Sequence, residues 1–359
     1  MPTERIISAD SHVAIKEEAV LAHLAAKHHD EYRRCRQEQM ALMMRRAKKK
    51  AAETAAPTQQ ATWDAAGRAG EYDPIARLKD MDIDGVEAEV LYSDVDANAA
   101  LYGMQGGGRL PAFRAFADAA LAFAAADPKR LLPVYPVPLV DVAEAVGEVG
   151  RLARAGARAL MLPLYPTDHG LAPYWDRQWD PLWAAIQETG LPISQHVNVH
   201  DRHWNILAID PTPAKGVFQS LPPISMSECV ASWIVPGTLE RFPQLRVVFV
   251  EAGLGWIPYF LERLDTMYER HGWRKMGMLA EKPSTYWHRQ MAATFEEDTF
   301  GIRNRHVIGI GNLMWATDYP HPDSTWPESQ KVLETHFHDV PVAEARDIIG
   351  GNAARFYAL

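Results

Sequence analysis

Eight short apolar segments, separated by stretches of helical character, constrain the fold of this chain more than any other feature of its sequence. Short runs in which apolar residues do not alternate with polar ones are typical of strands buried on both faces of a parallel sheet. The predicted strands are Arg5–Val13, Ala88–Tyr92, Leu131–Val137, Ala157–Leu164, Leu191–Asn198, Leu245–Glu251, Met291–Phe295 and Leu313–Asp318. Eight strands that alternate with helices predict a parallel (β/α)8 barrel of the TIM type.

The turn after the first predicted strand argues against the competing doubly wound sheet. That fold requires a glycine-rich turn at this point, where the backbone approaches a phosphate group. Residues 9–13 have the sequence ADSHV and contain no glycine, and Gly106–Gly108 does not lie between a strand and a helix. The barrel is therefore the predicted architecture.

No low-complexity linker divides the chain, so residues 1–359 are predicted to form one barrel domain. Residues 14–70 lack strand signals, and Glu17–Glu53 is rich in the Ala, Lys, Arg and Met residues that favour helix. We predict that residues 14–70 are a helical insertion after the first strand, which serves as a lid or an oligomer contact. Two or three C-terminal helices are expected after Pro327.

The acidic charge balance argues against polyanionic partners. The net charge is −9, which disfavours binding to nucleic acid or to an anionic membrane surface. Cys35 and Cys229 are the two cysteines, and they form neither a disulfide framework nor a metal-binding spacing. No apolar signal region or membrane span of roughly 20 residues is apparent. We therefore expect a cytoplasmic protein that acts on a small molecule.

Residue types that bind metals recur at the carboxyl ends of the predicted strands. Asp10 and His12 are two residues apart in the first strand and should face the same side. His196 belongs to the fifth strand, Glu251 ends the sixth and Asp318 ends the eighth. The carboxyl ends of barrel strands share one face, where such barrels have their active sites. These nitrogen and oxygen ligands predict a site for a first-row divalent cation.

The chain resembles the amidohydrolase-related family of metal-dependent enzymes, in the branch that includes the aromatic-acid decarboxylases and related hydrolases. The resemblance rests on the segments ADSHV, LPISQHVN, FVEAGLGWIPYFLERLD and MWATDYPHPDSTWPES and covers nearly the whole chain. It implies that Asp10, His12, His196 and Asp318 are metal ligands. Related decarboxylases usually have a histidine followed by glycine in strand six, where this chain has Glu251, and this difference argues against simple decarboxylase chemistry.

Glu251, Asp318, Tyr165 and His321 are the candidate catalytic residues. A glutamate beside a cation should stay ionised and ligate, so Glu251 and His321, with Asp318 three residues earlier, are candidates for a second metal site. Two cations at such sites share a bridging oxygen. Tyr165 follows the fourth strand and is either a phenolate ligand or hydrogen-bond donor in the same cavity or a residue packed on its rim.

Two reaction classes remain open. In the first, one Zn, Mn or Fe ion activates water and polarises a carbonyl, and Asp318 binds the ion or accepts the proton of the water. The outcome is hydrolysis or a related carbon–carbon cleavage. In the second, a dinuclear Fe/Fe or Mn/Fe centre activates dioxygen to hydroxylate a C–H bond, with a redox partner. The resemblance implies the second class because outlying members of the superfamily are dimetal monooxygenases.

The substrate is expected to be a small apolar or aromatic carboxylic acid derivative. Candidates to line its cavity are Trp204, Trp233, Trp256, Trp315 and Trp326. Arg202 and Arg289 are candidate ligands of its carboxylate, and His200 and His203 are expected to lie at the surface or behind the metal ligands. The inserted and C-terminal helices are expected to form a homodimer or higher oligomer.

Overall fold

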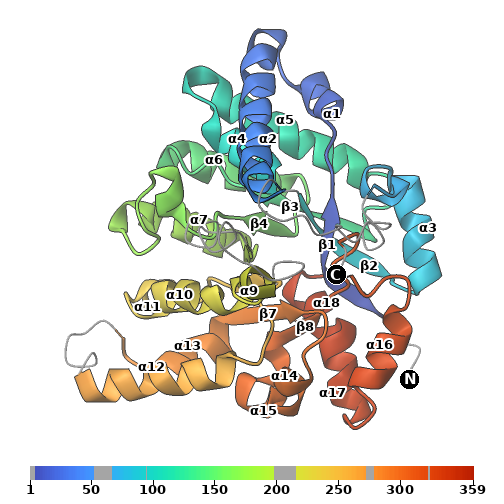
Figure 1. Ribbon diagram of the computed structural model, residues 1–359. Coiled ribbons are helices and arrows are strands. Elements are labelled where there is room, and N and C mark those ends of the chain that lie inside the picture. The colour runs from blue at the N-terminus through green and yellow to red at the C-terminus, as the bar shows by residue number, and fades with distance from the viewer. Residues whose placement is uncertain (1–4, 52–66, 94, 198–215, 272–278, 322–323) are drawn as a thin grey trace.

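Eight parallel strands form a sheet in sequence order at the centre of the molecule (Figure 1). The computed structural model describes residues 5–51, 67–93, 95–197, 216–271, 279–321 and 324–359. The strands are β1 (Ile7–Val13), β2 (Ala88–Ser93), β3 (Leu131–Pro136), β4 (Ala159–Met161), β5 (Ile193–His196), β6 (Val247–Val250), β7 (Met291–Phe295) and β8 (Leu313–Trp315). A parallel bridge between Ser11 and Tyr319 links the last strand to the first. The predicted (β/α)8 barrel is therefore confirmed.

Helices alternate with the strands around the outside of the sheet (Figure 1). Before β5 they are α1 (Glu17–His23), α2 (His29–Ala51), α3 (Pro74–Asp84), α4 (Val95–Gly103), α5 (Arg109–Ala124), α6 (Val142–Arg154) and α7 (Asp180–Thr189). After β5 they are α9 (Gly216–Gln219), α10 (Pro222–Ile234), α11 (Thr238–Arg241), α12 (Ile257–His271), α13 (Pro283–Gln290), α14 (Thr299–Arg303), α15 (Arg305–Ile308), α16 (Ser329–His336), α17 (Val342–Arg346) and α18 (Asn352–Phe356).

The helix boundaries follow local sequence signals. Helix α7 ends at Thr189, because Gly190 adopts a left-handed conformation (φ 70°). Helices α10 and α11 are separated by Pro236 and a left-handed Gly237 (φ 81°). Helix α4 was not predicted from the sequence.

The C-terminal segment closes the amino-terminal end of the barrel. The Asn352 amide donates to the carbonyl oxygens of Ile310 and Leu313, each at 2.7 Å, at the start of β8. Tyr357 packs in the apolar cluster inside the barrel, and its hydroxyl lies 3.5 Å from that of Tyr92. With this end filled, the chemistry is left to the carboxyl ends of the strands.

The predicted insertion packs on the outside of the barrel. Helix α1 contacts α5, and α2 runs beside α4 (Figure 1). Residues 52–66 of the insertion lie outside the described part of the chain. Its role as a lid or an oligomer contact, like the single-domain assignment, stays a prediction. No described helix is both long and apolar enough to cross a membrane.

Candidate metal centre

An irregularity in β1 turns Asp10 and His12 into the barrel. The pairing register with β2 shifts between Ser8 and Ser11. Ile7 and Ala9 belong to the apolar cluster inside the barrel, so odd-numbered residues face inward before the shift. After it, the inward-facing residues are even-numbered, as expected when a strand gains one residue. Asp10 and His12 share one side as predicted, and the shift makes that side the interior.

Three buried hydroxyl groups fix the seam where β1 meets β8. Ser8 and Ser11 lie 3.1 and 3.0 Å from the Thr317 hydroxyl oxygen, and Ser8 donates to the carbonyl of Asp10 at 2.7 Å. The backbone N–H of Asp318 donates to the same carbonyl at 3.0 Å. The seam therefore sets the positions of Asp10 and Asp318 relative to each other.

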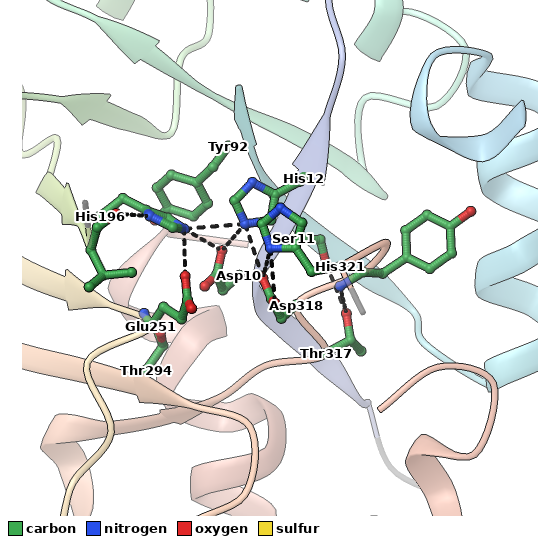
Figure 2. Close-up of polar contacts among 12 residues, drawn as sticks. Asp10, Ser11, His12, Tyr92, His196, Glu251, Thr294, Thr317, Asp318 and His321 are labelled. Atoms are coloured by element: carbon green, nitrogen blue, oxygen red, sulfur yellow. Dashed lines mark hydrogen bonds and ion pairs between the residues drawn. The ribbon is translucent and has the colours of Figure 1, made fainter. Parts of the chain in front are cut away.

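His196, the last residue of β5, points its Nε2 atom at β1 (Figure 2). Its Nδ1 atom lies 2.8 Å from the carbonyl oxygen of Val197, so Nδ1 carries the proton that it donates there. Nε2 then lies 3.2 Å from His12 Nε2 and 3.5 Å from Asp10 Oδ1. A backbone carbonyl that fixes one ring nitrogen and frees the other is a usual support for a metal-binding histidine.

Glu251 and Asp318 follow β6 and β8 in left-handed backbone conformations. Both have φ 55°, which costs about 1–3 kcal/mol for a residue other than glycine. The Glu251 N–H donates to Thr294 Oγ1 at 2.8 Å, which helps to hold this conformation. Glu251 Oε2 lies 3.7 Å from His196 Nε2, and Asp318 Oδ1 lies 3.0 Å from His12 Nε2. The strained turns aim both carboxylates into the barrel mouth.

His321 completes the cluster on the β8 side. Its Nδ1 atom lies 3.0 Å from the Asp318 carboxylate, and its ring stacks on that of His12 with centroids 3.8 Å apart. The side chain of His321 is 38% exposed, whereas that of Asp318 is 1% exposed. His321 therefore connects a buried carboxylate to solvent.

The six residues form two overlapping groups of potential cation ligands. Asp10, His12, His196 and Glu251 make one group, and His12, Glu251, Asp318 and His321 make the other. Both oxygens of Asp10, which is fully buried, and Oδ1 of Asp318 have no hydrogen-bond partner among the described residues. A buried carboxylate without donors is costly, and a divalent cation would satisfy it. The residues present therefore fit a cation.

The electrostatics of the cluster point the same way. Burial, followed by the charge of Asp318, raises the pKa of Glu251 well above its ordinary value. Burial alone would lower the pKa of His196, but the charge of Asp10 outweighs it and raises this pKa to about 9. Burial and the neighbouring His321 lower the pKa of His12. Without a cation, the cluster thus favours the protonated forms of Glu251 and His196. A bound divalent cation would take the place of these protons.

The overlap between the two groups favours one cation over two. Both groups use His12, whose Nε2 atom has a single lone pair and so binds one metal ion. A second cation would have to rely on Glu251, Asp318 and His321 alone, with Glu251 as the shared ligand. The arrangement is therefore better suited to a single ion.

A family model described as Amidohydrolase matches residues 21–359, which is almost the whole chain. The chain belongs to this amidohydrolase family. Membership assigns it to the metal-dependent hydrolases and lyases, as the sequence motifs predicted.

Solved structures of other proteins share the fold of this amidohydrolase. The 5-carboxyvanillate decarboxylase from Sphingomonas paucimobilis is 23% identical, with a TM-score of 0.74 and 99% of each chain covered. A 5-carboxyvanillate decarboxylase from Novosphingobium aromaticivorans, with bound manganese and 3-methoxy-4-hydroxy-5-nitrobenzoic acid, is 18% identical, with a TM-score of 0.73. The match covers 99% of this chain and 97% of that chain. A dihydroxybenzoic acid decarboxylase from a Polaromonas species, with manganese and 2-nitroresorcinol, is 15% identical, with a TM-score of 0.63. Here too the match covers 99% of this chain and 97% of the other.

Tyr165 lies away from the six candidate ligands of this amidohydrolase. Strand β4 ends at Met161, and the chain then leaves the barrel before the short 3-10 helix Pro166–His169. The Tyr165 hydroxyl donates to the carbonyl of Ser225 at 3.4 Å, and the ring lines a separate cavity between this loop and α10. These contacts agree with the second of the two expectations for Tyr165, a residue packed on the rim of the barrel mouth.

The other residues suggested for substrate binding have different surroundings. Trp233 is fully buried in the core and donates a hydrogen bond to Gln195, while Trp326 meets Tyr319 edge to face. Arg289 donates a hydrogen bond to the side chain of Gln290, and its guanidinium lies over the Tyr286 ring. These two contacts hold the guanidinium. Of the remaining suggestions, Trp315 is buried, Trp256 is partly buried, and His200, Arg202, His203 and Trp204 lie outside the described residues.

Glu296 is a member of the site that the sequence analysis missed. It directly follows β7, and its charge is one of the influences that raise the pKa of Glu251. The rule that selected Asp318, a carboxylate at the end of a barrel strand, would have found it.

Proposed function

We propose that this amidohydrolase is a decarboxylase that removes the carboxylate group of an aromatic acid with the help of one divalent cation. The observation that carries the proposal is the convergence of Asp10, His12 and His196, joined through His12 to Asp318, at the barrel mouth, where three buried carboxylate oxygens accept no hydrogen bond from the described residues. Proteins of the same fold that are 5-carboxyvanillate or dihydroxybenzoic acid decarboxylases support the reaction class.

Asp10, His12, His196 and Asp318 would bind the cation, and Glu251 would add a fifth ligand. Manganese is the cation bound to the decarboxylases from Novosphingobium aromaticivorans and Polaromonas. It suits this mixture of imidazole and carboxylate ligands, although zinc and iron have the same ligand preferences here. When bound, the cation acts as a Lewis acid that orients the acidic substrate and stabilises negative charge on its oxygen atoms.

The Asp318–His321 pair would supply the proton that the reaction consumes. Asp318 is buried and close to His12, while the partly exposed His321 contacts it at 3.0 Å and can exchange protons with water. In the proposed step, Asp318 donates a proton to the ring carbon that carries the carboxylate. The carbon–carbon bond then breaks, carbon dioxide leaves, and the bonding electrons restore the aromatic ring. His321 returns a proton to Asp318.

The presence of Glu251 is compatible with this scheme. A glutamate at this position argues against decarboxylation only if the residue must transfer protons, as a histidine can at neutral pH. With Asp318 and His321 moving the proton, the residue after β6 only needs to bind the cation, which an ionised glutamate does well.

An oxygenase would need features that the comparisons do not support. The decarboxylases described above are not monooxygenases, and hydroxylation would require dioxygen and two external electrons. We therefore do not propose the dinuclear iron or manganese–iron centre. Cytoplasmic location and a homodimeric or larger assembly stay predictions from the sequence.

Release of carbon dioxide tests the proposal directly. We expect the manganese-loaded protein to release one carbon dioxide per molecule of 5-carboxyvanillate or 2,6-dihydroxybenzoate, with no oxygen uptake, and a chelator to abolish the reaction. Metal analysis should give about one ion per chain. Oxygen consumption coupled to turnover, two ions per chain, or no carbon dioxide from a panel of hydroxylated benzoic acids would contradict the assignment.

A further inference from the structure

A cavity lies beside His196, between the cation ligands and the β3–β4 side of the barrel. Its volume is about 50 Å³, and it opens to solvent. Most of its lining is apolar or aromatic, from Tyr102, Pro136, Met161, Leu162, Pro163, Leu164 and Val197. Two further polar residues line it, Asn98 and His169. An apolar cavity with a few polar groups beside a metal site is a typical substrate pocket.

Tyr102 is a fixed wall of this cavity. Its hydroxyl donates to the carbonyl of Val137 at 2.6 Å, and the edge of its ring meets Phe113 at 80° with centroids 5.1 Å apart. His169 stacks on Tyr102 with centroids 4.8 Å apart and an angle of 28° between the rings. The hydrogen bond, the buried Phe113 and the stacked imidazole together set the orientation of the wall.

His169 has hydrogen-bonding capacity that the described protein does not use. Its two ring nitrogens make no hydrogen bond to another residue in the described part of the chain. His169 is exposed at the edge of the cavity, and partial desolvation lowers its pKa, although the adjacent Asp168 opposes the change. A neutral imidazole offers one N–H donor and one acceptor. The amide of Asn98, in contrast, already donates to the Ser93 hydroxyl at 3.1 Å.

Building on the proposed decarboxylase function, we infer that His169 determines specificity by hydrogen bonding to a hydroxyl or methoxy substituent of the aromatic acid. His196 marks the part of the cavity next to the cation, where the carboxylate of the substrate belongs. The aromatic ring would pack against Tyr102, Pro136 and Met161. A polar substituent away from the carboxylate would then accept or donate a hydrogen bond at the ring nitrogens of His169, whereas an unsubstituted ring would leave them to water.

Equilibrium binding of two acids to the manganese-loaded protein tests this inference. The probes are 4-hydroxy-3-methoxybenzoate and benzoate, titrated calorimetrically, and the quantity of interest is the ratio of their dissociation constants. His169→Phe keeps an aromatic ring to stack on Tyr102 but loses both hydrogen-bonding atoms. We expect the preference for the substituted acid to fall roughly five- to tenfold, with benzoate binding unchanged.

Two further variants separate recognition from a structural effect. His169→Gln retains a donor and an acceptor and should keep part of the preference. His338→Phe replaces a histidine on the surface, with 69% of its side chain exposed, and should keep all of it. An unchanged preference in His169→Phe, or an equal loss of both acids, would overturn the role of His169. Failure of the wild-type protein to bind either acid would instead refute the aromatic-acid function on which this inference rests.

Discussion

Buried carboxylates in two regions of the molecule differ in their hydrogen bonding. Around α3 and β2, Glu89 forms an ion pair with Arg77, and Asp80 accepts a hydrogen bond from Arg68 at 2.8 Å. At the barrel mouth, Asp10 and Oδ1 of Asp318 have no hydrogen-bond donor in the described chain.

The difference separates carboxylates that stabilise the fold from carboxylates that await a ligand. A buried charge that is paired and hydrogen-bonded within the chain is compatible with stability, whereas one that accepts no hydrogen bond depends on nearby imidazoles or on a cation. The strained backbone at Glu251 and Asp318 belongs to the second region as well. Unsatisfied charge and strain at the same place indicate a site selected for binding, at a cost in stability.

The largest effect expected from this contrast is that of His196→Ala on the barrel mouth. The substitution removes the Nε2 atom that lies between Asp10 and Glu251. We expect manganese affinity to fall by roughly a hundredfold or more, with a parallel loss of decarboxylation. Competition with a metal-sensitive dye measures the affinity. Full occupancy by manganese in this variant would show that the unpartnered carboxylates serve another purpose.

Matched removal of charge in each region should change stability by different amounts. Glu89→Gln leaves the buried Arg77 without its counterion and should lower the free energy of unfolding by about 3 kcal/mol, with or without metal. Asp10→Asn removes a carboxylate charge that accepts no hydrogen bond in the described chain but raises the pKa of His196, so the stability of the metal-free protein should change by less than about 1 kcal/mol.

Adding manganese should separate the two regions further, because its effect on the unfolding free energy depends on the cation ligands. It should stabilise the wild type and Glu89→Gln to a similar extent, because a ligand that binds only the folded state stabilises that state. The stabilisation should be largely absent in Asp10→Asn. Urea unfolding with and without manganese gives all six values. A loss of metal-free stability of more than about 1 kcal/mol in Asp10→Asn would mean that Asp10 is a structural residue.

The sequence was sufficient to predict the barrel, its eight strands and the convergence of Asp10, His12, His196 and Asp318. These features depend on hydrophobic pattern and on the shared direction of parallel strands, which short segments encode. The register shift in β1 could not be predicted, because it depends on pairing with β2 and on the hydroxyl groups at the β8 seam. The left-handed backbone at Glu251 and Asp318, neither of which is a glycine, also carries no local signal.

Acid titration offers a smaller test on the α3 side. Burial alone would raise the pKa of Asp80, but hydrogen bonds from Arg68 and Tyr319 outweigh it and lower this pKa below 3.8. A lowered folded-state pKa stabilises the protein above the unfolded-state value, and the stabilisation is lost as pH falls through the folded-state value. We expect the unfolding free energy of Asp80→Asn to depend less on pH below about 5 than that of the wild type. Equal slopes for the two proteins would argue against a stabilising role for the Asp80 charge.

The smallest effect is expected for Tyr165→Phe, which tests whether the site extends to the loop after β4. The phenol hydroxyl donates to Ser225, and its ring lines a cavity that contains none of the six candidate ligands. Losing this hydrogen bond should lower the unfolding free energy by about 1 kcal/mol and leave manganese affinity and the decarboxylation rate within about twofold of wild type. Steady-state kinetics and metal titration on the same preparation measure both. A tenfold or larger loss of rate with normal metal affinity would place Tyr165 in contact with the substrate, and the reaction would then extend beyond the region of unpartnered carboxylates.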